Sequence, residues 1–136
     1  MMTKTGSSTD RRTTIAVLGA QLSRVWGSEF MAGVLDCARA GNVNLVCFAG
    51  GRPSAIDRGR SYGMYDLVKP GQFDGVLLAA DLAHGLSRAE IEKFAAYLSP
   101  LPIASFAIPI KGVPTVMADN DRGMRAVVRH LVEVHK

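Results

Sequence analysis

Residues 113–136 read VPTVMADNDRGMRAVVRHLVEVHK, and this stretch predicts a short buried strand that leads directly into an amphipathic helix. The apolar run at 116–118 forms the strand, and Asp119 or Asn120 can cap the helix by accepting a backbone N–H bond. A carboxylate and an amide therefore follow a strand's carboxyl end, where open α/β sheets bind ligands. The apolar residues then recur at helical spacing: Met124, Val127, Val128, Leu131 and Val132.

Upstream, apolar runs of strand length alternate with helical patterns. Strands are expected at 14–19, 43–49, 73–79 and 102–106. Helices are expected at 28–40, at 61–68, and from a capping box of Ser87 and Glu90 to the residue before Pro100. The first run does not alternate, which predicts burial on both faces. The order βαβαβαββα indicates an α/β fold: a doubly wound, mainly parallel five-stranded sheet with helices on both faces.

Local glycine and cysteine positions give further predictions for the first helix and second strand. Gly33 falls on the helix's apolar stripe and suggests close approach to the sheet, and Gly41 supplies a left-handed residue after the helix. Cys37 and Cys47 fit no redox or zinc spacing and are expected to be buried free thiols.

Composition describes one ordinary globular domain. The chain has 136 residues, 48% of them hydrophobic and 21% charged, with a net charge of +4. We assign residues 1–13 to a disordered tail and 14–136 to a single α/β subdomain. No apolar run approaches a membrane span and no secretory signal is present, so a cytoplasmic protein is expected. The basic residues are interpreted as a solvated surface rather than a nucleic-acid site.

Signatures of catalysis are missing. The sequence has no GxGxxG after the first strand, no GxxxxGK[ST] and no GxSxG. His84, His130 and His135 lack metal-ligand spacing, so neither a metal nor a cofactor is expected. Asp81 and Asp119 could pair as acid and base, but a turn residue and a helix cap are the interpretations we favour. The chain is therefore expected not to be an enzyme, and no catalytic residue is assigned.

Polar and aromatic residues follow the predicted strands and form the candidate ligand site. Trp26 could stack on a sugar face, or it could pack between the first helix and the sheet. Arg52 follows two glycines and could grip an anion or hydroxyls, or lie solvated in its loop. Asn120 could bond a polyol or cap the last helix. The predicted ligand-binding set is Ser23, Trp26, Arg52, Asp81 and Asn120.

Residues 116–132, VMADNDRGMRAVVRHLV, resemble the ligand-binding core of the lactose-repressor family and the related type I periplasmic sugar-binding proteins. The segment IAVLGAQLSRVWGSEFMAGVLDCARAGNVNLVCFAGG looks like that family's first strand–helix–strand unit, and FDGVLLAA looks like its third strand. The resemblance implies two similar subdomains that close over a small ligand. The segments VNLVCFAGG and LPIASFAI most resemble the corresponding segments of family members that serve as sensory input to histidine kinases or diguanylate cyclases.

The departures from that family shape the functional expectation. Only thirteen polar residues precede the first strand, which leaves no room for a helix-turn-helix, so no direct DNA contact is expected. No export signal is seen, and the pattern of a second subdomain is absent. We therefore expect the first subdomain alone, a non-catalytic sensing fragment of a bacterial regulator or signalling protein that forms homodimers. It should bind a small polar ligand such as a sugar weakly or not at all, because half of the enclosing surface would be missing. The alternatives are a self-associating interaction module and a small flavodoxin-like enzyme.

Overall fold

The computed structural model describes residues 11–21, 25–53 and 62–135, with only the backbone described at 25–28. The chain forms five strands, three α-helices and two 3-10 helices within these ranges. In chain order they are β1 (Thr14–Gly19), α1 (Val25–Ala40), β2 (Asn44–Ala49), η3 (Gly63–Leu67), β3 (Gly75–Leu78), η4 (Ala80–Ala83), α2 (Arg88–Tyr97), β4 (Ile103–Phe106), β5 (Thr115–Val116) and α3 (Asn120–Val134).

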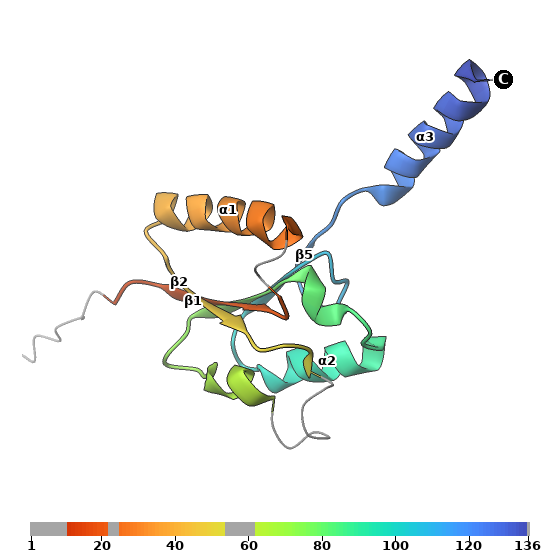
Figure 1. Cartoon of the computed structure of the whole chain (residues 1–136). Helices are drawn as coiled ribbons and strands as arrows, with labels where there is room; N and C mark the ends of the chain where they lie inside the picture. Colours follow the sequence, from red (N-terminus) through yellow and green to blue (C-terminus); the bar gives the residue numbers. More distant parts are fainter. Residues whose placement is uncertain (1–10, 22–24, 54–61, 136) are drawn as a thin grey trace, which may run out of the picture.

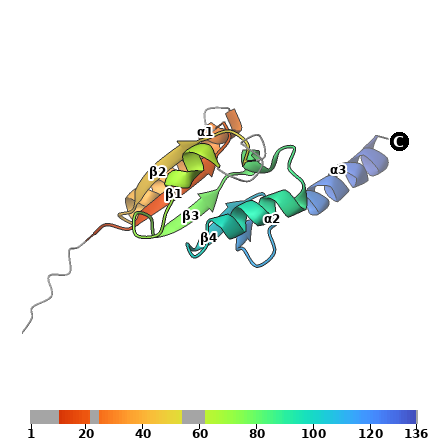
Figure 2. The same cartoon turned by 90° about the horizontal axis from the view of Figure 1, so that it is seen from below.

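All neighbouring strands of the sheet run parallel, in the order β2-β1-β3-β4-β5. Helix α1 lies on one face, and η3 with α2 lies on the other (Figures 1 and 2). This division follows from the right-handed crossover rule: the chain moves one way across the sheet from β1 to β2 and the other way afterwards. The doubly wound parallel α/β fold predicted from the sequence is confirmed.

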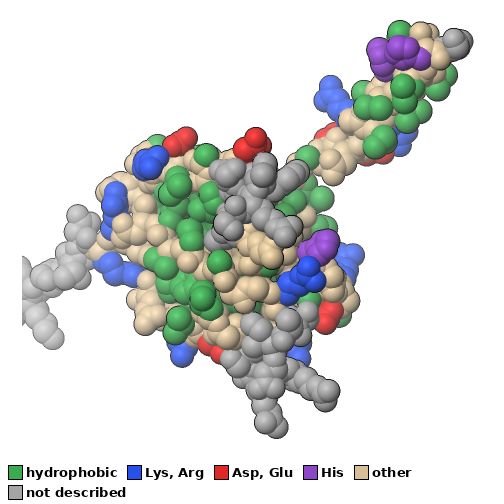
Figure 3. Space-filling view, in the orientation of Figure 1, with side chains coloured by type: hydrophobic (Ala, Val, Ile, Leu, Met, Phe, Trp, Pro, Cys, Tyr) green, Lys and Arg blue, Asp and Glu red, His purple; other side chains and the backbone are tan. Residues whose placement is uncertain are grey.

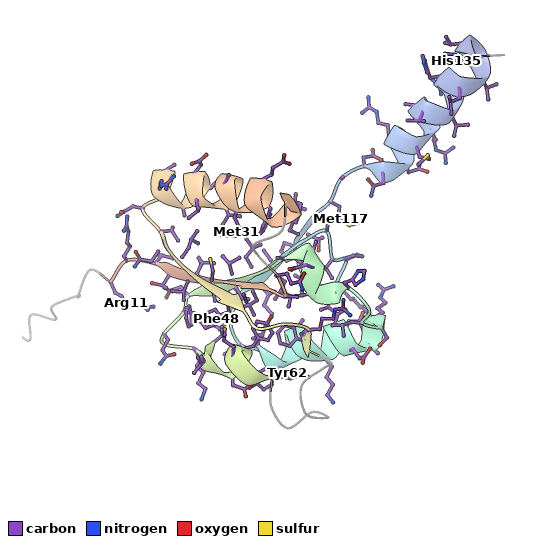
Figure 4. The ribbon with its side chains drawn as sticks, viewed as in Figure 1. Arg11, Met31, Phe48, Tyr62, Met117 and His135 are labelled. Carbon is purple, nitrogen blue, oxygen red and sulfur yellow. The ribbon has the colours of Figure 1, made fainter. Side chains whose placement is uncertain are left out.

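The main core fills the space between the sheet and the layer of η3 and α2. Val17 and Leu18 in β1 are fully buried, as the unalternated run predicted, although they face opposite sides of the sheet. Phe94 of α2 is also fully buried and meets the rings of Tyr62 and Tyr65 edge-on, with ring centres 5.0 and 5.4 Å away. Figure 4 shows Tyr62 beneath the sheet and Met31 on the opposite side, below α1.

Helix α2 begins as the sequence predicts. The Ser87 side chain accepts a bond from the backbone N–H of Glu90, and the Glu90 carboxylate accepts one from the backbone N–H of Ser87. The Ser87 hydroxyl also donates to Glu90 Oε2 at 2.7 Å, and this bond, together with the one from the Ser87 backbone N–H, favours the ionised carboxylate and lowers the pKa of Glu90 below its ordinary value. The reciprocal capping box thus fixes where the helix starts.

The end of α1 differs from the prediction. The left-handed residue is Asn42, with φ 53°, and not Gly41. Val43 N–H donates to Ala38 O at 2.8 Å and Asn42 N–H donates to Arg39 O at 3.2 Å, which is a Schellman ending displaced by one residue. Asparagine tolerates this conformation better than most residues because its short polar side chain can bond locally.

Three predictions of close packing around α1 are wrong. A Cβ at Gly33 would meet nothing within 4 Å, so this glycine does not bring the helix closer to the sheet. Cys37 and Cys47 are exposed rather than buried. The predicted stripe holds at Ala38, which is buried, and at Phe30 and Val34, which are half-buried together with Met31, but it fails at Gly33 and Cys37. Cys47 lies on the edge strand β2, where α1 covers the sheet only partly.

Two residues assigned to the tail are bonded to the folded body. Arg11 forms an ion pair with Asp74, and its guanidinium also donates to Gln72 O at 3.0 Å. Arg12 donates to Asn42 O at 2.8 Å. Arg11 is labelled in Figure 4 where the chain enters β1. These bonds fix the two residues before the first strand to the loops that precede β2 and β3.

Helix α3 projects away from the body of the protein (Figures 1 and 2), and none of its residues is buried. Its apolar stripe is present as predicted, but it faces solvent. None of the helices in the described part of the chain has the length and apolar character needed to span a membrane.

Candidate functional site

The candidate site lies where the chain leaves β1 and β3 at their carboxyl ends. These neighbouring strands lead to helices on opposite faces of the sheet, which makes the edge between them the topological switch point, the position at which doubly wound proteins bind ligands in a crevice. Gln21 follows β1, and Asp81 lies in η4, directly after β3. The backbone N–H of Gln21 donates to Asp81 Oδ2 at 2.5 Å, which joins the two loops.

The second carboxylate oxygen of Asp81 is the unusual feature of this crevice. Oδ1 is buried and has no hydrogen-bond partner among the residues that the structure describes. A buried acceptor without a donor is costly, and native proteins normally satisfy such atoms with a protein group, water or ligand. Oδ1 therefore lacks the donor that a buried carboxylate oxygen normally has, which makes Asp81 the first residue to consider for contact with a bound molecule.

Tyr65 ties together the carboxyl ends of β1 and β2. Its single O–H lies within hydrogen-bond distance of two acceptors, Gly19 O at 2.8 Å and Gly51 O at 2.7 Å, and is shared between them, and its side chain is fully buried. A Cβ at Gly50 would lie 2.8 Å from Tyr65 Cζ, so only glycine lets the backbone pass this ring. The tyrosine thus holds the glycine turn after β2 against the end of β1.

Arg52 extends from this glycine turn toward the loop after η4. It is exposed, and its Nη1 lies 3.4 Å from the position that a Cβ at Gly85 would occupy. Gly85 itself has φ +80°, a conformation that favours glycine. The structure therefore brings Arg52 beside the loop that begins with Asp81, and places a cation and a carboxylate on neighbouring loops of one edge.

The other predicted site residues are placed less fully. Ser23 lies outside the described residues. Trp26 belongs to the first turn of α1 rather than to the loop before it, and its side chain is not described. Asn120 is the first residue of α3 and is exposed, beyond the point where the chain leaves β5. Asp119 caps that helix by accepting from Arg122 N–H at 3.0 Å.

Sequence reasoning missed two features of this edge. Tyr65 falls in a short segment with weak helical character, and no local pattern shows that its hydroxyl reaches two distant carbonyls. Phe30 of α1 stacks on Phe106 at the end of β4, with ring centres 4.7 Å apart, which closes the edge on the α1 side. Both depend on tertiary contacts between segments far apart in the chain.

No cluster of three or more potential metal ligands occurs in residues 11–21, 25–53 and 62–135. The His130 and His135 rings meet edge-on with centres 5.2 Å apart, near the end of α3 and far along the chain from the crevice residues. The chemistry of the crevice is that of hydrogen bonding: one carboxylate, one guanidinium and backbone groups exposed by glycine.

Comparison with protein-family models, curated proteins and solved structures found no match to this chain.

Alkaline pH should weaken the fold through Tyr65. Burial, with a further contribution from the charge of Asp81, raises the pKa of this phenol from 10.0 to about 12. The folded protein thus holds the proton more tightly than the unfolded chain. The contribution that protonated Tyr65 makes to stability is complete below pH 10 and is lost as the pH rises through 12. The difference in free energy of unfolding between the wild type and Tyr65→Phe should therefore fall by about 1–2 kcal/mol as the pH rises, with partial screening by solvent taken into account.

Urea denaturation of the wild type and Tyr65→Phe at a series of pH values from 9 to 12 tests this expectation. Tyr97 also has a raised pKa, chiefly because it donates to Asp66, but it is present in both proteins and cancels in the comparison. A gap between the two proteins that stays constant over this range would contradict the prediction.

Proposed function

We propose that this chain is a non-catalytic ligand-sensing domain that binds a small polar, sugar-like molecule at the carboxyl edge of its sheet. Its setting would be the cytoplasm of a bacterium, as the sensory part of a transcriptional regulator or signalling protein. The proposal is carried by one observation, the buried Oδ1 of Asp81 with no partner among the described residues, at the topological switch point between β1 and β3.

The chemistry of the crevice suits a polyol. An O–H group of a sugar can donate to Asp81 Oδ1 and remove the cost of its unpaired burial. Arg52 has only donor groups, so it complements ring and hydroxyl oxygens. Gly50 and Gly51 bring the backbone to the same edge without side chains that would block a ligand.

The resemblance of residues 116–132 to the lactose-repressor type supports a role in sensing. A sensor responds to a ligand only through the ligand's differential affinity for two conformations. Here the loops after β1 and β3 are joined by the Gln21–Asp81 bond, so a molecule that bonds Asp81 acts on both loops at once. The resemblance also favours binding over catalysis, and Asp119, the other acid of the enzyme alternative, is engaged as a helix cap.

Amide chemical-shift titration of the full chain with a panel of monosaccharides and polyols tests the proposal. We expect saturable shifts at Gln21, Gly51 and Asp81 with dissociation constants of about 1 mM or weaker, because the described residues offer a ligand only one carboxylate and one guanidinium. Asp81→Asn should abolish these shifts, since the amide can place a donor where the ligand's hydroxyl must donate.

Asp36→Asn is the matched control, because Asp36 is an exposed acid on α1 and lies away from the crevice. It should leave the titration unchanged. Binding that persists in Asp81→Asn, shifts that map to other surfaces, or no response to any member of the panel would overturn the proposal.

A further inference from the structure

Helix α3 exposes an apolar stripe too wide to be an accident of composition. Six large hydrophobic side chains on its 15 residues are between 51% and 63% exposed. They are Met124, Val127, Val128, Leu131, Val132 and Val134. Figure 3 shows these side chains along the projecting helix. An isolated helix of this length is marginal in water, so α3 needs an apolar surface to cover the stripe.

The stripe is shaped for a broad surface rather than for a coiled coil. A two-stranded coiled coil uses a narrow seam of a and d positions over at least three heptads. Helix α3 spans about two heptads, and Val128 and Val132 widen its stripe beyond the seam formed by Met124, Val127, Leu131 and Val134. A stripe of this width is typical of a helix that packs on a sheet.

The same chain carries a bare strip of sheet on the face of α1. Residues in register point to the same side, and on this side burial falls steadily from the centre of the sheet to the edge. Val17 of β1 is fully buried, Leu77 of β3 is half-buried, and Ala104 of β4 is exposed. At the edge, Val116 of β5 is 70% exposed. Helix α1 therefore leaves this face bare at the β5 edge, although its Phe30 reaches Phe106 at the end of β4.

The face of α1 is also the face on which a helix returning from β5 would lie. The right-handed rule applies to a helix between two parallel strands, and for a crossover from β5 back across the sheet, in the direction taken from β1 to β2, it gives the face of α1. The uncovered strip over β4 and β5 is the part of that face next to the returning helix. The helix and the strip thus form a complementary pair of apolar surfaces within one sequence.

The arrangement seen in the structure is that of an open protomer. The chain continues outward through Met117, which is 54% exposed and labelled in Figure 4 where the chain leaves the sheet. The helix start is already complete in this position: Asp119 accepts from Arg122 N–H, and Asn120 N–H donates to Ala118 O at 2.9 Å. The segment between β5 and α3 is three residues long, and a short hinge of this kind can carry a helix to a second copy as well as back to its own sheet.

From these observations we infer that α3 is exchanged between two copies of this chain, each helix packing its apolar stripe on the strip of its partner formed by Ala104, Val116 and their neighbours. Each open protomer offers one helix and one strip, so a reciprocal exchange with two-fold symmetry satisfies both copies and closes the assembly. The strip would then be covered by the apolar stripe of α3 from the second chain.

Sedimentation velocity over a range of concentrations tests the stoichiometry. The full chain should be dimeric, and the double variant Val128→Gln/Leu131→Gln should raise the dissociation constant roughly 100-fold or more. The matched control, Arg122→Gln/Arg129→Gln, changes two residues on the opposite face of the helix and should leave the dimer unchanged. Glutamine is a good helix former, so all variants keep the helix. A monomer at every concentration would overturn the inference.

Thiol cross-linking identifies which surfaces meet. In a background with Cys37 and Cys47 replaced by serine, one protein carries Ala104→Cys and a second carries Val128→Cys. After the two are unfolded and refolded together with a flexible bis-maleimide, helix exchange predicts a covalent heterodimer. Efficient homodimers of Val128→Cys alone would show instead that two α3 helices pair with each other. No covalent heterodimer would show that α3 folds back on its own sheet. Either result overturns the exchange.

Discussion

Replacing Phe94 with alanine is expected to lower the free energy of unfolding by about 3–5 kcal/mol. The ring is fully buried and contacts the rings of Tyr62 and Tyr65, so truncation removes buried apolar area and leaves a cavity beneath the sheet. Domains of this size are stabilised by about 5–15 kcal/mol, so the loss is a large part of the total. Urea denaturation followed by circular dichroism measures it, with the slope expected to stay unchanged.

Leu67→Ala is the comparison for this experiment. Leu67 belongs to η3 in the same layer but is 60% exposed, so its truncation should cost less than about 1 kcal/mol. If the two variants lost similar stability, the layer of η3 and α2 would not be packed around Phe94 as the structure shows. The difference in stability loss between the two variants reports how tightly the side chains of this layer are packed, because both variants remove a hydrophobic side chain from it.

The fold could be predicted from the sequence because its signals are local and mutually consistent. The unalternated run in β1 indicates a strand buried on both faces, and the capping box of Ser87 and Glu90 marks the start of α2 to the residue. Once strands and helices alternate, the handedness of crossovers leaves few topologies. The parallel sheet therefore follows from short-range patterns and one general rule.

The details that could not be predicted depend on contacts between distant segments. The inward face of α1 is set by how far the helix extends over the edge strand, so Cys37 and Cys47 are exposed although their neighbours are apolar. The role of Tyr65 depends on two carbonyls, one of which lies 46 residues away in the chain. The periodicity of α3 indicates an apolar stripe but cannot say which surface covers it.

The candidate site likewise combines features that the sequence predicts with features that it does not. Parallel strands bring their carboxyl ends to one edge, so Arg52 and Asp81 could be assigned to that edge from the order of elements alone. The bond between Gln21 and Asp81 and the unpaired second oxygen of Asp81 could not be assigned in this way, because both depend on the exact path of two loops. The position of Asn120 depends on α3, whose packing the sequence does not specify.

Tyr65→Phe is expected to lower the free energy of unfolding by about 2–3 kcal/mol, a large effect for the loss of one oxygen atom. The change keeps the ring in its place against Phe94 but removes the donor from Gly19 O and Gly51 O. A buried acceptor left without a donor costs more than an average hydrogen bond contributes, and here the strands β1 and β2 share the donor. Urea denaturation at pH 7 measures the change.

Tyr97→Phe is the matched control, because it deletes the same atom from a tyrosine that is 47% exposed and donates to a single acceptor, Asp66. Water can replace that bond, so the expected loss is about 0.5 kcal/mol. Equal losses in the two variants would mean that the Tyr65 hydroxyl is not sequestered from water. A loss confined to Tyr65 would mean that the glycine turn bearing Arg52 is held to the sheet by this hydroxyl. The crevice would then be a preformed feature of the fold, to which a ligand adds only its bonds to Asp81 and Arg52.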